Sequence, residues 1–423
     1  MYVCGPTVYN YIHIGNARSA VAFDTIRRYF EYCGYTVNYI SNFTDVDDKI
    51  IKAANEAGIS TKELSDKFIA AFMEDTGQLG IKPATQNPRV INYMDEIIAF
   101  VSTLVDKGFA YVSEGDVYFR VAKSNNYAKL ANKTLEDLEI GASGRTDAET
   151  ERKENPLDFA LWKAAKEGEV SWDSPWGPGR PGWHIECSVM ATEILGDTID
   201  IHGGGADLEF PHHTNEIAQS EAKTGKTFAN YWMHNGFVNV DNEKMSKSLG
   251  NFVTVHDMLQ TVDGQVLRFF LATQQYRKPI NFTEKAIHDA EVNLKYLKNT
   301  HSLPLTEQVN QAELQTYLDA FQEAMDDDFN TANGVTVLFD MAKWINSGNY
   351  DQTVKDAFEK MLQVFGIVFE EEVLDEDIEK LIEERQAARA NKDFATADRI
   401  RDELAAQGIK LLDTKEGVRW TRD

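Results

Sequence analysis

The sequence of 423 residues has few cysteines: only Cys4, Cys33 and Cys187 occur, and no C-x-x-C pair is present. Widely spaced cysteines of odd number do not form a disulfide framework, and they exclude a zinc knuckle built from cysteines alone. Because 43% of the residues are hydrophobic, the chain can bury a large core without disulfides. We therefore expect a protein of the reducing cytoplasm.

The sequence also lacks an apolar run long enough to cross a membrane, and no secretory signal precedes its first motif. These absences agree with a cytoplasmic location and predict no membrane partner.

Basic residues are scarce, with 43 Lys and Arg against 68 Asp and Glu and a formal net charge of −25. Such a field repels nucleic acid, so a nucleic-acid partner needs a less acidic local surface. The segment from Gly366 to Glu379 has seven acids and no base, whereas residues 381–423 carry nine bases and nine acids. This last segment is the relatively basic part of the chain, although a solvated helix face explains scattered cations equally well.

The order of elements predicts an α/β fold. Residues 2–4 are typical of a short buried strand, residues from Asn16 of a helix that Gly34 ends, and residues 37–40 of the next strand. A strand–helix–strand unit implies a parallel sheet with helices on its faces. Helix is predicted from about Leu64 to Lys107, and short extended pieces between about 108 and 178 suggest an insertion in the sheet domain.

The second half of the chain is predicted to be mostly helical. Residues 253–299 and the long amphipathic stretches between 313 and 365 favour helices, the latter forming a bundle. The acidic segment that follows is predicted to be a linker, and the last segment combines helix with two short extended pieces.

His13, Gly15 and Asn16 lie in YIHIGNAR, on the loop that opens the first predicted helix. A helix N-terminus offers free N–H donors and the positive end of the helix dipole, which attract phosphate. Gly15 lets a ligand approach the backbone, and His13 can donate to phosphate oxygens. A loop histidine that satisfies a backbone carbonyl explains these residues as well, so the motif is weak alone.

The string Lys244-Met245-Ser246-Lys247-Ser248 is more specific. Two lysines and two hydroxyls in a loop flanked by glycine make a phosphate clamp, in which each lysine acts as a point charge. A solvated loop is the alternative interpretation.

A third pattern, FPHHTNEIAQSEA, places His212 and Glu216 one helical turn apart, with Pro211 suited to the first helical position. A shared metal ion and an exposed polar helix face both explain this spacing.

The two phosphate motifs on a parallel sheet resemble those of the class I aminoacyl-tRNA synthetases, in which they flank ATP. The segments MYVCGPTVYNYIHIGNAR, NFTDVDDKI, PGWHIECSVM, DIHGGGADLEFPHHTNEIAQSEA and KMSKSLGN resemble the cysteinyl-tRNA synthetase family in order and over nearly the whole chain. The resemblance implies that L-cysteine and ATP, with Mg²⁺, form cysteinyl-adenylate and pyrophosphate. The cysteine is then transferred to the 3′ end of tRNA(Cys).

The resemblance further implies one Zn²⁺ per subunit, held by Cys4, Cys187, His212 and Glu216. Thiolate, imidazole and carboxylate are all ligands of zinc. His213 lies about 100° further round the helix, so we expect a structural role for it. Such an ion would bind the substrate thiolate and separate cysteine from serine, because small differences in an apolar pocket are worth only about 1–3 kcal/mol.

The other site residues follow from the resemblance by position. His13, Lys247 and Lys244 are expected to be catalytic, with Lys247 the leading phosphate contact. The residues expected to bind ATP are His13, Gly15, Asn16, Gly203, Gly204, Gly205, Asp207 and Lys247, with His202 nearby. The three glycines from Gly203 to Gly205 are expected to form a turn after a strand. Gly5, Thr44, Trp183 and His184 are expected around cysteine, although Trp183 also suits a packing role in the core.

We expect a monomer with the following domain order. It comprises a Rossmann-like class I catalytic domain (1–252, with a connective insertion at about 108–178), a helical stem-contact region (253–299), a helical bundle that binds tRNA (300–365), an acidic linker (366–380) and a C-terminal anticodon-binding domain (381–423). Arg399, Arg401, Arg419 and Trp420 are candidates for contacts with the anticodon.

The chain departs from the family at a few points. Members usually carry a short segment before the first strand, Ser19 stands where proline is common, and Cys33 matches no ligand and is expected to be a partly buried packing residue. Two alternatives stay open. A related ligase joins cysteine to an amino sugar and lacks an anticodon-binding end, and a catalytically silent zinc-binding or nucleic-acid-binding protein would not need both intact motifs.

Overall fold

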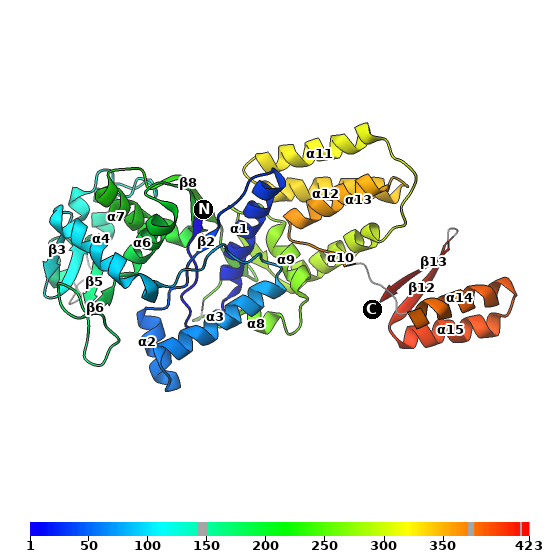
Figure 1. Ribbon diagram of the computed structural model, residues 1–423, viewed down its shortest axis with the longest axis horizontal. Helices are drawn as coiled ribbons and strands as arrows, with labels where there is room; N and C mark the ends of the chain where they lie inside the picture. The colour runs from blue at the N-terminus through cyan, green and yellow to red at the C-terminus, as the bar shows by residue number, and fades with distance from the viewer. Residues whose placement is uncertain (143–149, 247, 371–375, 415–416, 423) are drawn as a thin grey trace. The chain divides into compact units, whose positions relative to one another are not determined.

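The computed structural model describes residues 1–142, 150–246, 248–370, 376–414 and 417–422. The chain divides into two units, Met1–Val368 and Phe369–Asp423, and each has a hydrophobic core of its own (Figure 1).

A parallel sheet of the first unit carries the beginning of the chain. Its strand order is β2-β1-β7-β8, and every neighbouring pair is parallel. The strands are β1 (Tyr2–Val3), β2 (Ile40–Ser41), β7 (Ile199–Gly205) and β8 (Ala229–Asn235). Helix α1 (Ile14–Tyr32) connects β1 to β2, as predicted, and the α/β fold class is confirmed.

Helix α1 begins two residues earlier than predicted because His13 caps it. The His13 side chain accepts a hydrogen bond from the Asn16 N–H, and the Asn16 side chain accepts one from the His13 N–H. This reciprocal cap satisfies two backbone donors that a helix otherwise leaves without partners. The second strand is also displaced, since β2 covers Ile40–Ser41 rather than residues 37–40.

The helical stretch predicted from about residue 64 to residue 107 is interrupted. After α2 (Asp48–Ala57), helix α3 (Thr61–Gln78) ends before Gly80, whose φ of +65° favours glycine. Pro83 and Pro88 then keep the chain extended until a 3₁₀ turn (Val90–Tyr93) leads into α4 (Met94–Asp106).

A separate antiparallel sheet lies between β2 and β7 in the sequence. Its order is β3-β4-β5-β6, with β3 (Ala110–Ser113), β4 (Asp116–Phe119), β5 (Phe159–Ala164) and β6 (Gly179–Pro181). Short helical elements accompany it: Val121–Lys123, α5 (Leu135–Ala142) and Thr150–Arg152. One buried cluster joins both sheets and the helix after β6, α6 (Trp183–Leu195), and includes Tyr2, Ile40, Trp162 and Ile185.

The remaining elements of the first unit are mostly helical. They are the turns Ala206–Leu208 and Glu209–His213, α7 (Thr214–Thr224), α8 (Val255–Met258), α9 (Gly264–Ala272), α10 (Glu284–His301), α11 (Gln311–Asp326), α12 (Thr331–Asn346) and α13 (Gln352–Val364). A small sheet of order β10-β9-β11 comprises β9 (Val238–Val240), β10 (Glu243–Lys244) and β11 (Ile280–Phe282). Helices α10 to α13 pack side by side, and Phe321, Leu338 and Phe358 are fully buried among the bundle's apolar residues.

Two buried arginines attach α1 to the following helices. Arg268 of α9 pairs with Asp24 of α1 at 2.6 Å and donates to the carbonyl of Phe365. Arg18 of α1 donates to the carbonyls of Leu271 and Gln275. The helix that begins at the first phosphate motif is therefore anchored to α9 and the chain that follows it.

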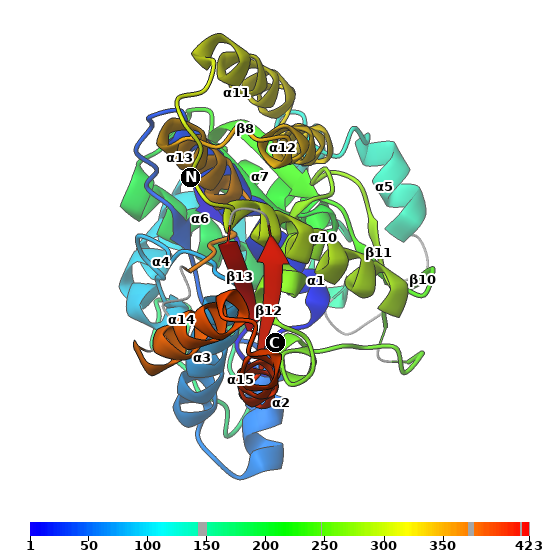
Figure 2. The same ribbon diagram turned by 90° about the vertical axis from the view of Figure 1, so that its right-hand side faces the viewer.

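The second unit contains two helices and a hairpin (Figure 2). Helix α14 (Glu376–Ala390) packs on α15 (Phe394–Ala406), and β12 (Ile409–Thr414) pairs antiparallel with β13 (Gly417–Arg422). Its core consists of Ile378, Ile382, Ile400, Leu404 and Ile409. Across all the residues that the model describes, no helix is long and apolar enough to span a bilayer.

Candidate active site and metal centre

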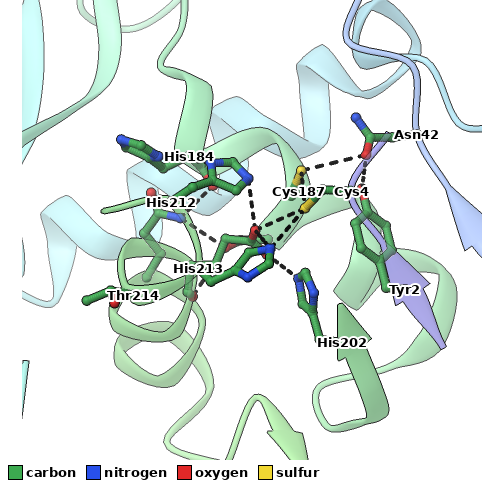
Figure 3. Close-up of polar contacts among 12 residues, drawn as sticks. Tyr2, Cys4, Asn42, His184, Cys187, His202, His212, His213 and Thr214 are labelled. Carbon is green, nitrogen blue, oxygen red and sulfur yellow. Dashed lines mark hydrogen bonds and ion pairs between the residues drawn. The ribbon is translucent and has the colours of Figure 1, made fainter. Parts of the chain in front are cut away.

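Four predicted metal ligands come together from four elements (Figure 3). Cys4 follows β1, Cys187 lies in α6, His212 lies in the turn before α7, and Glu216 lies in the first turn of α7. One donor atom of each residue lies within 4.8 Å of the others, and Cys187, His212 and Glu216 are buried. Residues up to 212 positions apart thus share one point in space.

The spacing of these donors fits a zinc ion. Zinc–ligand bonds of 2.0–2.3 Å in a tetrahedron place the donors roughly 3.3–3.8 Å apart. The Cys4 and Cys187 sulfurs are 3.7 Å apart, Cys4 Sγ lies 3.6 Å from Glu216 Oε1, and His212 Nε2 lies 3.0 Å from the same oxygen. The chemistry of the donor set therefore suits the ion, and both distances from Cys4 Sγ lie in this range, whereas the His212–Glu216 distance is shorter.

Burial and neighbouring groups shift the pKa values within the cluster. Burial alone raises the pKa of Glu216, but His202 and His212 outweigh it, so the pKa lies well below its usual range. Burial alone lowers the pKa of His212, but Glu216 and Cys187 raise it to about 10. Burial raises the pKa of Cys4, whereas its hydrogen bond to Cys187 lowers the Cys187 pKa to about 6, so Cys187 ionises first.

Further histidines surround the four donors. His202 Nε2 lies 2.7 Å from Glu216 Oε2, and His213 Nε2 lies 3.4 Å from Cys4 Sγ. His184 Nδ1 contacts His212 Nδ1 at 3.0 Å, and His213 Nδ1 contacts His234 Nε2 at 2.8 Å. Burial lowers the pKa of His184 to about 3 and that of His234 to about 4, so both are neutral at physiological pH. Because Cys4, His202, His213 and Glu216 also lie within 4.8 Å of one another, the geometry allows a second donor set beside the predicted one.

A cavity of about 630 Å³ adjoins the cluster and joins it to both phosphate motifs. Cys4 lines this cavity and also belongs to the cluster. Predicted site residues that line it are Cys4, Gly5, His13, Gly15, Asn16, Trp183, Gly205, Asp207 and Lys244. Lys247 lies outside the described residues. Cys4 and residues of both motifs therefore line one cavity.

Comparison with known proteins agrees with this arrangement. Residues 1–292 match the family model for the catalytic domain of class I tRNA synthetases (C), residues 320–370 the DALR domain, and residues 371–420 the cysteinyl-tRNA ligase anticodon-binding domain. The cysteine–tRNA ligase of Streptococcus thermophilus is 95% identical over all 423 residues, and those of Streptococcus pyogenes and Streptococcus agalactiae are 84% and 82% identical. In each case the match covers 100% of this chain and 95% of the relative.

The chain belongs to the cysteine–tRNA ligase family. It is a class I aminoacyl-tRNA synthetase, and the predicted activity, ligation of cysteine to tRNA, is confirmed. Among solved structures, the fold is similar to that of the methionyl-tRNA synthetase of Mycobacterium tuberculosis in complex with methionyl-adenylate. That similarity has a TM-score of 0.62 at 16% identity and covers 86% of this chain and 89% of the other.

The sequence also allowed a packing role in the core for Trp183. The structure shows that Trp183 does not pack there. Its side chain is 42% exposed, lines the cavity, and stacks on His212 with ring centroids 4.3 Å apart. The exposed ring therefore lies between a proposed metal ligand and the space available to a substrate.

The glycines of β7 have a different place from the predicted turn. They form the end of the strand, and a Cβ on Gly203 would lie 2.4 Å from the Phe23 ring. Gly203 and Gly204 do not line the cavity, unlike Gly205. The absence of a side chain at Gly203 lets α1 approach the sheet, so this glycine serves packing.

Three further predicted site residues do not line the cavity. His202 is fully buried and contacts Glu216, so its place near an adenylate stays a prediction. Thr44 and His184 also lie outside the lining, although His184 contacts His212. Cys33 is exposed rather than packed.

Asn42 was missed by the sequence analysis. Its Oδ1 accepts from the Gly5 N–H and from the Tyr2 hydroxyl at 3.0 Å each, and it lies 3.8 Å from Cys187 Sγ. Asn42 therefore holds the chain on both sides of Cys4. The only local signal was an asparagine two residues after the end of the second predicted strand.

Proposed function

We propose that Cys4, Cys187, His212 and Glu216 hold one zinc ion per chain, and that the adjoining cavity binds L-cysteine and ATP. The carrying observation is that Cys4 belongs both to the four-donor cluster and to the lining of the cavity with His13 and Lys244. A sulfur ligand on the wall of a nucleotide pocket is what recognition of a mercapto substrate requires.

When bound, zinc supplies a direct bond to the substrate thiolate, which the hydroxyl of serine matches poorly. The chain provides the surroundings of this bond. Gly5 lets the chain after Cys4 pack closely on the backbone of Asn42, since a Cβ there would lie 1.7 Å from the Asn42 carbonyl oxygen. Trp183 covers His212 on the cavity side. We propose that these two residues orient the bound amino acid.

The reaction needs no protein nucleophile. The carboxylate of cysteine attacks the α-phosphate of ATP, the bond between the α- and β-phosphates breaks, and pyrophosphate leaves. The 3′-terminal ribose hydroxyl of tRNA then attacks the carbonyl carbon of the adenylate and displaces AMP. Positioning the reactants and stabilising the charge that develops on phosphate account for most of the acceleration in such reactions. We assign these tasks to the N-terminus of α1 with His13, Gly15 and Asn16, to Gly205 and Asp207, and to Lys244 and Lys247, with Mg²⁺ on the phosphates.

We further propose that tRNA(Cys) contacts the helical bundle at 300–365 and the C-terminal residues 381–423. The match of residues 371–420 to an anticodon-binding domain supports the second contact. Arg399 and Arg401 are half-exposed or more, and among the described residues their ion pairs are with acids on their own helix, so they can exchange these partners for phosphate. Trp420 packs partly against the core of the second unit, so less of its ring is available for stacking on an anticodon base. We propose that the protein acts as a cytoplasmic monomer, which light scattering would test.

Cysteine-dependent exchange of pyrophosphate into ATP tests the proposal. The protein loaded with zinc should exchange with cysteine and not with serine, and removal of the metal should abolish the exchange with cysteine. Equal exchange with cysteine in metal-free protein would contradict the role of zinc. Offering tRNA and an amino sugar as acceptors would test the alternative ligase, which requires transfer to the sugar.

A further inference from the structure

The backbone that leaves the late phosphate motif is paired with the backbone that carries the early one. Ile14 N donates to Val253 O at 3.1 Å, and Val255 N donates to Ile12 O at 3.0 Å. His13 and Thr254 form an antiparallel bridge between these two bonds. The position of residues 253–255 therefore determines how the segment after the late motif lies against His13.

The side chain of Asn251 makes hydrogen bonds to the backbone of the late motif. Its Oδ1 accepts from Ser246 N at 2.8 Å, and its Nδ2 donates to Lys244 O at 3.2 Å. The next residue, Phe252, places its ring edge-on to the ring of His13, with the centroids 5.3 Å apart. Lys244 is thus connected through a short run of residues to the strand pairing at His13.

His256 lies directly after this run and ties it to α3. Its Nδ1 lies 3.2 Å from Oδ1 of Asp75, whose side chain is only 2% exposed. The His256 ring stacks on Tyr11 at 4.2 Å with an angle of 16°. Tyr11 in turn meets the ring of Phe68 edge-on. His256 therefore joins α8, α3 and the loop that precedes the early motif.

The contact with His256 compensates part of the cost of burying the Asp75 carboxylate. Within the described part of the chain, Oδ2 of Asp75 has no hydrogen-bond partner. Burial raises the pKa of this carboxyl, and His256 opposes the rise. Removal of His256 would leave a buried carboxylate unpaired, which costs more than losing a surface contact.

We propose that His256 and Asp75 are positioning residues for adenylate formation. They fix residues 251–256 against α3 so that Lys244 and His13 face the same nucleotide. This inference rests on the proposed function, because it needs Lys244 and His13 to act on ATP. Neither His256 nor Asp75 is placed against the substrate.

The test compares His256→Ala, His256→Asn and Asp75→Asn in the full-length protein. His256→Asn keeps an N–H donor near the position of Nδ1 and loses the ring. We expect His256→Ala and Asp75→Asn to lower kcat for pyrophosphate exchange by about 10- to 100-fold, since small displacements of reacting groups are costly. KM for cysteine and zinc content should stay unchanged, and His256→Asn should recover most of the rate.

Tyr111→Phe is the matched control. It removes a similar contact to a buried carboxylate in the antiparallel sheet of the insertion, where the Tyr111 hydroxyl donates to Asp158 Oδ2 at 2.7 Å. The control should change thermal stability without changing the exchange rate. If His256→Ala and Asp75→Asn also changed only thermal stability, the pair would be structural and the inference would be overturned.

A double-mutant cycle with Lys244→Ala separates the inference from the proposed function. If His256 acts by placing Lys244, its replacement should lower the rate less than about twofold in the Lys244→Ala background. Losses that multiply would overturn the inference. A normal exchange rate in Lys244→Ala alone would instead refute the phosphate role of Lys244.

Discussion

His202 Nε2 lies 2.7 Å from Glu216 Oε2, and both side chains are completely shielded from solvent. The His202 ring is stacked on Trp232 at 4.5 Å, which fixes its plane. Glu216 is a proposed zinc ligand, and His202 contacts its Oε2 while Cys4 and His212 contact its Oε1. Partners of this kind orient metal ligands and strengthen metal binding.

We therefore predict that His202→Ala weakens zinc binding by about 10- to 100-fold. Competition with a chromophoric chelator would measure this directly, without reference to activity. His288→Ala, which changes an exposed histidine of α10, should bind zinc normally. Unchanged affinity in His202→Ala would show that Glu216 needs no support from this ring.

Cys187 and Cys33 are predicted to respond differently to replacement by serine. Cys187 is 1% exposed and lies among the four donors, whereas Cys33 is exposed. Cys187→Ser should lose zinc and cysteine-dependent pyrophosphate exchange together, because a hydroxyl is a much poorer zinc ligand than a thiolate. Cys33→Ser should retain both. Metal analysis and the exchange assay on the same samples would check the pair, and activity in metal-free Cys187→Ser would refute the zinc assignment.

The buried pair of Asp24 and Arg268 predicts a pH-dependent stability. Burial alone raises the pKa of Asp24, but Arg268 and Arg28 outweigh it and the pKa is lowered. A carboxyl with a lowered folded-state pKa stabilises the fold above its unfolded pKa, about 3.9, and this contribution is lost as the pH falls below that value. Asp24→Asn should therefore reduce the free energy of unfolding at pH 7 by about 3–5 kcal/mol, because it leaves Arg268 buried without its partner.

Denaturant unfolding of the wild type and Asp24→Asn at pH 7 and below pH 4 would check this sign. The difference between them should shrink in acid. Asp24→Leu with Arg268→Met removes both charges and should cost less than Asp24→Asn alone. A difference that grew in acid would contradict the assigned pKa direction.

Much of the site could be predicted because its signals are local. His13, Gly15 and Asn16 lie within four positions, and their capping geometry depends on one turn of backbone. The spacing of His212 and Glu216 likewise brings their side chains to 3.0 Å, although Pro211 lies ahead of the helix rather than at its first position. Resemblance to the family supplied the two cysteines, which no local pattern connects.

The contacts around the ligands could not be predicted in this way. His202 and His234 occupy ordinary strand positions and Asn42 lies directly after β2, and their roles arise only where neighbouring strands bring them beside the cluster. Gly203 was read as a turn residue because a run of glycines suggests one, but the approach of Phe23 from α1 explains it. The burial of Arg18 and Arg268 could not be predicted from the sequence either, since a single charged residue on a helix usually faces solvent.

By itself, the sequence determined the class of fold, the family and the two phosphate motifs, because strand and helix periodicity and short motifs are properties of neighbouring residues. Only the tertiary structure decided that Cys4 and Cys187, 183 positions apart, lie 3.7 Å from each other beside a cavity that both motifs reach. The physical reason is that a parallel sheet brings the carboxyl ends of distant strands to one edge. Which side chains meet there depends on the packing of helices that the local sequence does not encode.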